Sequence, residues 1–199
     1  MNTKIPENGL VLNQIIKNKN YTIGAELGVR RGELSSSLVS NNPELKMFCV
    51  DLWDHHESFN ELNPHESNFK SYLDNISGLE DRITTLKKLT TEACDDIEND
   101  SLDFIFLDAT HTYNALKLDI LSWLPKVKKG GLISGHDYHP FFDNSGIIKI
   151  VNEMFGNPDI EFPSGSFDFD THTEEMTQYL LNHNKLAVDH KTTCWYINK

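Results

Sequence analysis

The segment from Tyr21 to Val39, YTIGAELGVRRGELSSSLV, constrains the fold more than any other part of the chain. It predicts a buried strand over residues 22–26, a tight turn that carries Gly28 and Gly32, and a helix that begins near Gly32. Glycine allows a positive φ and lets a ligand approach the main chain closely. The first turn of a helix adds unpaired N–H groups that favour an anionic group. The segment therefore predicts a ligand-binding turn at the end of a strand in an α/β fold.

The spacing of this turn, Glu26-x-Gly28-x-x-x-Gly32, differs from the GxGxxG pattern of dinucleotide-binding proteins. A carboxylate at Glu26 would repel a pyrophosphate, whereas it would attract an amine or a sulfonium. S-adenosylmethionine (SAM) carries both cations, together with a carboxylate that backbone N–H groups can bind. The segment also resembles motif I of the class I SAM-dependent methyltransferases, which commonly reads E/D-x-G-x-x-x-G. A strand–glycine–helix turn of some other α/β fold is the alternative.

A second predicted strand, residues 46–52, carries Asp51, which stands 25 residues after Glu26. An acid at this position suits the two hydroxyls of a ribose, as in dinucleotide-binding folds, and a capping aspartate is the alternative. Residues 53–68 then lose periodicity and predict a loop over the sheet edge. Three histidines of this loop could contact an acceptor, although solvated side chains are the commoner outcome. They are His55, His56 and His65.

The pattern continues with a helix over residues 69–76, a third strand over residues 81–86 and a helix that opens at residues 89–93 with a threonine as its cap. In the methyltransferases that the chain resembles, this last turn runs along the adenine of SAM. Lys88-Leu89-Thr90 stands here in place of the usual Gly-Asp-Ser. The match assigns Thr90 to cofactor binding, with backbone groups in place of the missing acidic contact.

Composition limits the classes of function. The chain has 199 residues and a formal net charge of -12, which opposes binding to nucleic-acid phosphates. The N-terminus lacks the pattern of a signal peptide, and no apolar run reaches 18 residues, so neither secretion nor a membrane span is expected. The three cysteines are scattered and odd in number, which is typical of reduced core residues in a cytoplasmic protein. They are Cys49, Cys94 and Cys194. We expect one domain over residues 1–199.

Residues 101–138 carry the second informative pattern. Residues 102–107 form a nearly unbroken apolar run, typical of a parallel strand covered on both faces, and end on Asp108. An amphipathic helix follows, which Pro125 and the pair Gly130-Gly131 are expected to close. A fifth strand, residues 132–135, ends on His136-Asp137-Tyr138. If these two strands are neighbours, Asp108, His136 and Asp137 converge beside the glycine turn.

The pattern Asp108-x-x-His111-x-Tyr113, followed by Gly130-Gly131 and Gly135-His136-Asp137-Tyr138, resembles a small-molecule branch of the class I methyltransferases. Related macrocin-type and sugar O-methyltransferases hold a divalent metal between the acid after strand four and an acidic pair after strand five. Carried over, Asp108 and Asp137 are metal ligands for Mg²⁺ or Mn²⁺, and His136, which stands where those enzymes have an acid, is the candidate third ligand. The sequence leaves open whether a metal binds.

The resemblance implies a Rossmann-like class I methyltransferase fold: a mostly parallel seven-stranded sheet, helices on both faces and an antiparallel terminal strand at residues 192–197. Residues 156–190 fall outside it and predict a variable flap and helix. It also implies O-methylation of a small polar acceptor, such as a sugar or a polyol-bearing natural product. Asp108 would contribute to catalysis beside a histidine base, for which His111 is preferred over His139 because it lies three residues past Asp108.

Two other functions stay open. One is a metal-dependent hydroxylase-like protein of the same fold, since histidines and carboxylates also ligate iron. The other is a SAM-binding partner subunit without activity. The sequence does not identify the acceptor, and a homodimer is one option for the assembly.

Overall fold

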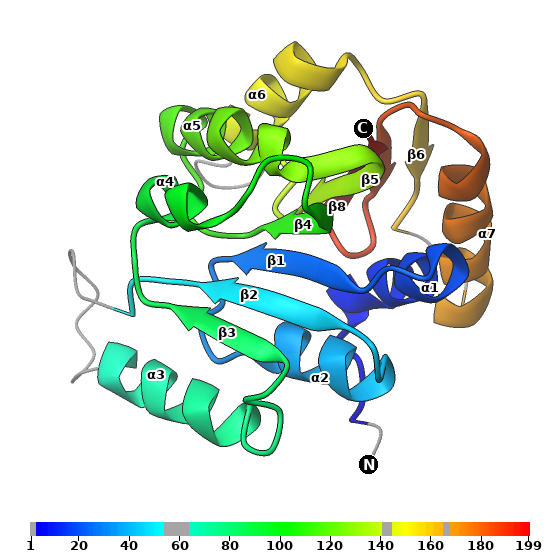
Figure 1. Cartoon of the computed structure of the whole chain (residues 1–199). Helices are drawn as coiled ribbons and strands as arrows, with labels where there is room; N and C mark the ends of the chain where they lie inside the picture. The colour runs from blue at the N-terminus through cyan, green and yellow to red at the C-terminus, as the bar shows by residue number, and fades with distance from the viewer. Residues whose placement is uncertain (1–2, 54–63, 141–144, 165–167) are drawn as a thin grey trace.

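The computed structural model describes residues 3–53, 64–140, 145–164 and 168–199. Its centre is an eight-stranded sheet with the order β3-β2-β1-β4-β5-β8-β7-β6 (Figure 1). The neighbours pair in parallel except at β8, which is antiparallel to both β5 and β7. The strands are β1 (Ile23–Leu27), β2 (Lys46–Val50), β3 (Ile83–Leu86), β4 (Leu102–Leu107), β5 (Val127–Gly135), β6 (Ile160–Phe162), β7 (Ala187–Asp189) and β8 (Cys194–Asn198).

Helices cover both faces of this sheet (Figure 1). One hydrophobic core joins α1, α2, α3 and α7 to the first face, and the other joins α4, α5 and α6 to the second. The described helices are α1 (Leu10–Lys19), α2 (Glu33–Asn41), α3 (Pro64–Asn75), α4 (Thr90–Ala93), α5 (Tyr113–Trp123), α6 (Ser145–Phe155) and α7 (Phe169–Asn182), with short 3-10 turns at Glu7–Gly9, Cys94–Asp96 and Leu124–Lys126. Within the described ranges, every helix is too short or too polar to span a lipid bilayer.

Strand β4 shows why the sheet must be covered on both faces. Every residue of β4 is buried, and from Phe104 onward its side chains alternate between the two cores. Phe104 and Phe106 pack in the first core, while Ile105 and Leu107 pack in the second. A strand buried on both sides has no solvent-facing positions, so its sequence is apolar except at Asp103. The predicted Rossmann-like fold, with its mostly parallel sheet and antiparallel terminal strand, is confirmed.

The sheet has eight strands where the sequence predicted seven. The additional edge strand is β6, which lies within the segment expected to be a variable flap and helix. That segment also contains α7 and β7. Strands β6 and β7 have only three residues each, which is too few to display a two-residue period, so no sequence pattern predicts them.

The prediction that Gly130 and Gly131 close a helix is wrong. Helix α5 ends at Trp123, and both glycines lie inside β5, which extends from Val127 rather than from Leu132. Gly130 has φ +81, and the pairing of β4 with β5 changes register between Leu102 and Phe104. The glycines therefore allow an irregular strand to continue rather than ending a helix.

Part of the predicted loop over residues 53–68 is helical, because α3 begins at Pro64 and includes the helix expected at residues 69–76. Residues 54–63 lie outside the described part of the chain, and so do His55 and His56. The side chain of His65 is not described either. The prediction that these histidines contact an acceptor stays a prediction.

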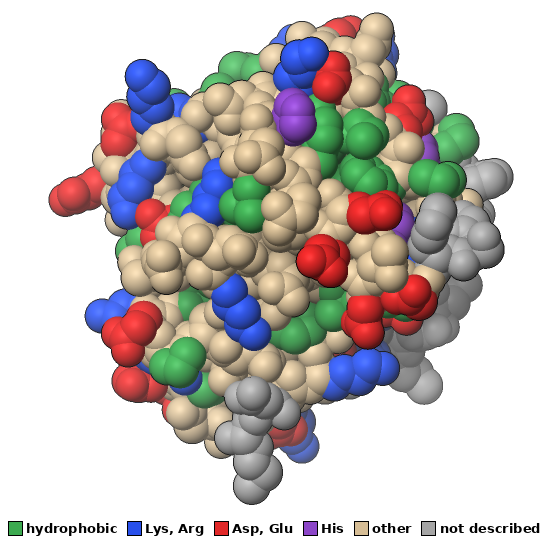
Figure 2. All heavy atoms as spheres, turned by 90° about the vertical axis from the view of Figure 1, so that its right-hand side faces the viewer, with side chains coloured by type: hydrophobic (Ala, Val, Ile, Leu, Met, Phe, Trp, Pro, Cys, Tyr) green, Lys and Arg blue, Asp and Glu red, His purple; other side chains and the backbone are tan. Residues whose placement is uncertain are grey.

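Figure 2 shows the molecular face formed by α7 and β6, where acidic side chains border hydrophobic ones. A shallow hollow of about 640 Å³ lies here, with an apolar floor and two glutamates on its rim. Its lining residues are Ile160, Phe162, Thr171, Glu174, Glu175, Gln178 and Tyr179. None of them belongs to the residues predicted to act in catalysis or cofactor binding, so this hollow is separate from the candidate site.

Candidate active site

The carboxyl ends of β1, β2, β4 and β5 meet at one edge of the sheet (Figure 1). Backbone hydrogen bonds join the residues that follow these strands. The Gly28 N–H donates to the carbonyl at the end of β2 (2.9 Å), and the Asp108 N–H donates to the carbonyl at the end of β1 (2.8 Å). The His136 N–H donates to the carbonyl at the end of β4 (3.1 Å). The glycine turn, Asp108 and His136 therefore start from adjacent positions, as expected for neighbouring parallel strands.

Two glycines of the turn after β1 have backbones that only glycine adopts readily. Gly28 has φ +87, and a Cβ placed on it would lie 2.1 Å from the Asp108 carbonyl oxygen. Gly32 has φ +75 and directly precedes α2, and its Cβ would lie 2.7 Å from the ring of Tyr72. Gly28 thus lets the loops after β1 and β4 touch, while Gly32 lets α2 begin against α3.

Asp51 binds the backbone of the same turn. Its Oδ2 accepts hydrogen bonds from the N–H groups of Val29 (2.9 Å) and Arg30 (2.8 Å), and its Oδ1 accepts one from Trp53 N–H (2.8 Å). The Trp53 indole donates to the Arg30 carbonyl (2.7 Å). Asp51 therefore holds the turn in shape, and about one lone pair, on Oδ1, is left for a ribose hydroxyl.

Glu26 lies beneath the turn and is only 4% exposed. Its Oε2 accepts hydrogen bonds from the backbone N–H of Ser35 (3.1 Å) and from the Ser35 hydroxyl. Burial raises the pKa of Glu26 to about 8; the Ser35 hydroxyl opposes this shift, and the charges of Asp108 and Asp51 add to it. Within the described part of the chain, the groups that shift this pKa include no cation.

The acidic groups around the turn decide which cofactor it suits. A ligand that brings a positive charge close to Glu26 would relieve the repulsion from Asp51 and Asp108. A pyrophosphate would increase that repulsion. The surroundings of Glu26 therefore fit an amine- and sulfonium-bearing ligand such as SAM better than a pyrophosphate, although the turn itself also carries the exposed Arg30 and Arg31.

Thr90 does not cap α4. The residue before this helix is Leu89, which makes no side-chain cap hydrogen bond, so the capping prediction is wrong. The Thr90 hydroxyl instead donates to the buried Asp119 carboxylate of α5, and the Trp123 indole donates to the Thr90 carbonyl (2.9 Å). These bonds tie α4 to α5. The Thr90 hydroxyl is engaged away from the turn, which leaves backbone groups of this segment for any contact with a cofactor.

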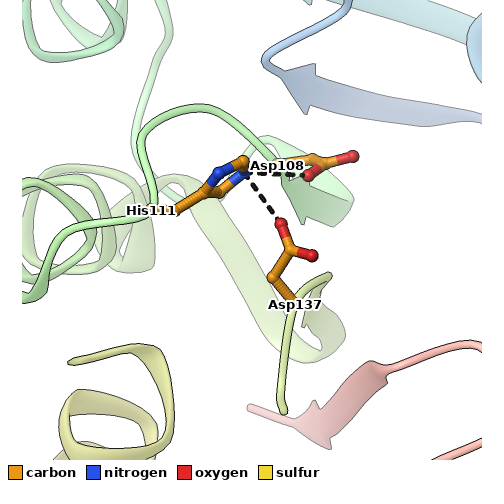
Figure 3. A group of neighbouring side chains, drawn as sticks. All are labelled: Asp108, His111 and Asp137. Atoms are coloured by element: carbon orange, nitrogen blue, oxygen red, sulfur yellow. Dashed lines mark ion pairs between the residues drawn. The ribbon is translucent and has the colours of Figure 1, made fainter. Parts of the chain in front are cut away.

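A carboxylate–histidine group stands next to the glycine turn (Figure 3). Asp108 and His111 both lie in the loop between β4 and α5, and Asp137 follows β5, so two loops supply the group. His111 Nε2 lies 2.8 Å from Asp137 Oδ2 and 3.6 Å from Asp108 Oδ1. One ligand atom from each residue lies within 4.8 Å of the other two. Among the described residues, the histidine of this group is His111, whereas the sequence predicted His136.

Asp137 is the centre of the wider cluster. It has φ +62, a left-handed backbone that is uncommon for aspartate. Its Oδ1 lies 3.3 Å from His136 Nδ1 and 3.3 Å from His139 Nε2, so three histidines surround one carboxylate. Burial opposes ionisation of Asp137, but hydrogen bonds from His111 and His136 outweigh it and lower the pKa of this carboxyl.

The same contacts favour protonated histidines. Hydrogen bonds to Asp108 and then to Asp137 raise the pKa of His111 to about 9, although partial burial opposes the shift. For His136, burial acts to lower the pKa, but the bonds to Asp108 and Asp137 outweigh it and raise the pKa to about 10. Without a cation, the cluster therefore holds imidazolium rings against two carboxylates.

The cluster also fits a divalent cation. Carboxylate oxygens suit Mg²⁺ and Mn²⁺, and an imidazole nitrogen shifts the preference toward Mn²⁺. A cation bound to Asp108 and Asp137 would take the place of the histidine protons, because it supplies the positive charge that the carboxylates attract. Asp108 and Asp137 are the two carboxylates that the sequence suggested as metal ligands. Besides His111, His136 Nδ1 faces both of them, 3.6 Å from Asp108 Oδ1 and 3.3 Å from Asp137 Oδ1.

Three residues that the sequence did not single out shape this site. Ser35 binds Glu26, Trp53 binds the glycine turn, and Thr193 contacts His136. Ser35 stands in a run of three serines that no pattern distinguishes. Thr193 fell within the predicted terminal strand, whereas β8 begins only at Cys194. Trp53 and Thr193 lie outside helices and strands, where side-chain directions have no period, and Ser35 lies on α2, where the sequence does not distinguish it from Ser36 and Ser37.

The chain is similar to several known proteins. A family model described as a methyltransferase domain matches residues 25–138, more than half of the chain. An uncharacterized protein of Sinorhizobium fredii, y4gI, is 28% identical over 125 residues, which cover 58% of this chain but only 13% of that protein. The chain thus spans a small part of this relative's length.

Solved structures share the fold. A protein from Staphylococcus aureus proposed to be a caffeoyl-CoA O-methyltransferase has a TM-score of 0.59 at 16% identity, over 98% of this chain and 84% of its own. A protein from Nostoc punctiforme proposed to be an O-methyltransferase has a TM-score of 0.57 at 16% identity, over 96% of this chain and 55% of its own. The fold, the acidic glycine turn and the family match over residues 25–138 lead to one conclusion: the chain belongs to the methyltransferase domain family.

Proposed function

We propose that this chain transfers a methyl group from SAM to a hydroxyl of a small polar acceptor, with help from a divalent cation. The observation that carries the proposal is the contact between two sites of different chemistry at one sheet edge. The acidic glycine turn and the Asp108–His111–Asp137 group are joined at Gly28, whose backbone touches that of Asp108. A cofactor in the turn would place its reactive end next to the carboxylates and histidines.

The charges around the glycine turn support SAM as the cofactor. Glu26 would bind the amine of SAM, Asp51 the ribose, and the N–H groups near Gly28 and Gly32 its carboxylate, while the backbone near Thr90 lines the adenine side. Bound there, SAM supplies an electrophilic methyl group, and the residues of the chain supply its position. Positioning alone accounts for a large part of the rate of a two-substrate reaction.

The carboxylate–histidine group supports a hydroxyl as the methyl acceptor. A hydroxyl must lose its proton as it attacks, and a hydroxyl polarised by a cation loses it more easily. His111 is 48% exposed, so an acceptor can reach its ring, whereas His139 is 17% exposed. The hydrogen bonds to Asp108 and Asp137 raise the pKa of His111. A cation bound to these two carboxylates would remove that effect, so that a neutral ring becomes available to accept the proton. We therefore assign the proton to His111 rather than to His139.

The test begins with binding. Calorimetry should give micromolar affinity for SAM and S-adenosylhomocysteine and no measurable binding of NAD. Turnover of SAM to S-adenosylhomocysteine is then measured with a panel of sugars, polyols and phenols, with Mn²⁺ or with EDTA. Product that depends on acceptor and metal supports the proposal. Binding of SAM without any acceptor-dependent turnover would favour a silent partner subunit, and oxidation of an acceptor with iron would favour a hydroxylase-like protein.

A further inference from the structure

The turn between β7 and β8 contacts the cluster from the far side of His136. Thr193 Oγ1 lies 3.2 Å from His136 Nε2. The other ring nitrogen, Nδ1, lies 3.3 Å from Asp137 Oδ1 and 3.6 Å from Asp108 Oδ1. The two nitrogens of His136 therefore have different partners: one faces the carboxylates and the other faces a hydroxyl.

This contact selects one orientation of the ring. Rotation of an imidazole by half a turn exchanges Nδ1 with Cδ2 and Nε2 with Cε1. In the rotated ring, carbon atoms would face both the carboxylates and Thr193, and both hydrogen bonds would be lost. The Thr193 hydroxyl can donate to Nε2 or accept from it, and it accepts when Nδ1 gives its lone pair to a cation, because Nε2 then carries the ring proton. Nδ1 is left to serve the carboxylates or a cation.

The backbone of Thr193 is unfavourable for its residue type. It has φ +56, in the left-handed region that glycine and asparagine adopt readily and β-branched residues avoid. A hairpin turn at this position would be more stable with glycine. Strain of this kind persists where surrounding contacts enforce it, and it concentrates at functional sites. The backbone conformation favours glycine at this position, so the contact made by the threonine hydroxyl explains the residue type better.

Buried contacts hold the turn in place. Asp189, at the end of β7, is fully buried and accepts hydrogen bonds from the N–H groups of Lys191 (2.9 Å) and Thr192 (3.4 Å) and from the Thr192 hydroxyl (2.7 Å). His172 of α7, which is also buried, bonds the same carboxylate (2.8 Å). The Tyr138 N–H donates to the Thr193 carbonyl (2.8 Å) and links the turn to the loop that carries Asp137. These hydrogen bonds therefore hold the turn against His136.

We infer that Thr193 is a positioning residue: its hydroxyl accepts a hydrogen bond from His136 Nε2–H and keeps Nδ1 facing the carboxylates of Asp108 and Asp137. The effect on cation binding rests on the proposed function, whereas the orientation of the ring does not. Outer hydrogen bonds of this type typically change metal affinity by about 10- to 100-fold.

Two substitutions separate the hydroxyl from the backbone. Thr193→Ser keeps the hydroxyl, and Thr193→Gly removes it but suits the positive φ. Mn²⁺ affinity is measured by electron paramagnetic resonance, and thermal stability by circular dichroism. We expect the serine variant to bind Mn²⁺ within about twofold of the parent protein. The glycine variant should bind about 10- to 100-fold more weakly while its melting temperature stays equal or rises.

A purely structural role would give another pattern. In that case the glycine variant would keep its Mn²⁺ affinity, or it would lose affinity and melting temperature together; either result overturns the inference. If the parent protein binds no Mn²⁺, the proposed cation site fails, and the ring is then examined by nitrogen-15 NMR of the metal-free protein. A protected His136 Nε2–H resonance in the parent and serine proteins, absent in the glycine variant, supports the positioning role. The same resonance in all three proteins refutes it.

Discussion

Replacing Glu26 by glutamine should stabilise the ligand-free protein and weaken its binding of SAM. Glu26 is 4% exposed, and its pKa rises from an ordinary value of 4.5 to about 8 on folding. Below pH 4.5 the Glu26 carboxyl is protonated in both the folded and the unfolded protein, so it does not change the free energy of unfolding. As the pH rises toward 8, the unfolded state ionises first, so the wild-type protein loses stability. Above pH 8 the loss levels off.

The size of this loss follows from the shift. Each pH unit between the two pKa values costs about 1.4 kcal/mol, so the folded wild-type protein is destabilised by roughly 2–4 kcal/mol at pH 8 relative to pH 5. Glutamine does not ionise and keeps an oxygen for Ser35. The free energy of unfolding of Glu26→Gln should therefore exceed that of the wild type by an amount that grows with pH over this range.

Urea denaturation of both proteins at pH 5, 6, 7 and 8 measures the difference directly. Glu33→Gln is the matched control, because Glu33 lies on α2 nearby but is exposed. It removes the same charge from an exposed position. A difference for Glu26→Gln that grows with pH no more steeply than the difference for Glu33→Gln would refute the claim that Glu26 is a desolvated acid.

Binding of SAM supplies the second half of the prediction. A ligand amine beside Glu26 should return its pKa toward the ordinary range, so close to one proton is released per SAM bound near pH 7. Calorimetry in buffers of different ionisation enthalpy counts this proton. Glu26→Gln should release none and bind SAM about 10- to 100-fold more weakly, the scale of one charged hydrogen bond. Equal proton release by both proteins would contradict the assignment of the amine to Glu26.

Three further predictions concern the rest of the site. Gly28→Ala should lower the free energy of unfolding by about 2–4 kcal/mol, because the new Cβ would meet the Asp108 carbonyl. The control is Gly78→Ala, which has φ +82 but nothing within 4 Å of its Cβ and should lower the free energy of unfolding by about 1 kcal/mol. Equal losses in urea denaturation would contradict the close approach of Gly28 to Asp108. Asp137→Asn should weaken Mn²⁺ binding at least about tenfold and leave SAM affinity unchanged in calorimetry; full activity in EDTA would show that the cluster works without a metal. His111→Ala should lower the methyl-transfer rate by about 10²- to 10⁴-fold at saturating SAM, and if His139→Ala has that effect instead, the base is assigned to the wrong histidine.

The strongly patterned parts of the chain predicted the fold well. The apolar run of β4 and the glycine turn after β1 lie where the sequence placed them, because burial on both faces and a positive φ each restrict the allowed residues. The edge strand β6 and its neighbour β7 have no signal of their own in the sequence, since three residues carry no period. Gly130 and Gly131 were placed at a helix end because glycine interrupts helices and irregular strands alike.

The candidate site shows a sharper limit. The acids at the ends of β2, β4 and β5 could be found from the sequence, because parallel strands bring their carboxyl ends to one edge. The order of the side chains around Asp137 could not be found, because His111, His136 and His139 all lie in loops where their directions depend on tertiary contacts. Asp51 was assigned to a ribose by its position, and only the structure reveals its bonds to the turn.

The central claim is that the glycine turn and the carboxylate–histidine group form one methyl-transfer site. Proton–carbon NMR of SAM labelled with carbon-13 at its reactive methyl tests it most directly, since bound Mn²⁺ broadens only resonances close to it. We predict that the methyl resonance of bound SAM is sharp with Mg²⁺ and broadened beyond detection with Mn²⁺, and that Asp137→Asn restores it. A bound methyl resonance that stays sharp with saturating Mn²⁺ would place the cation away from the cofactor and contradict the account.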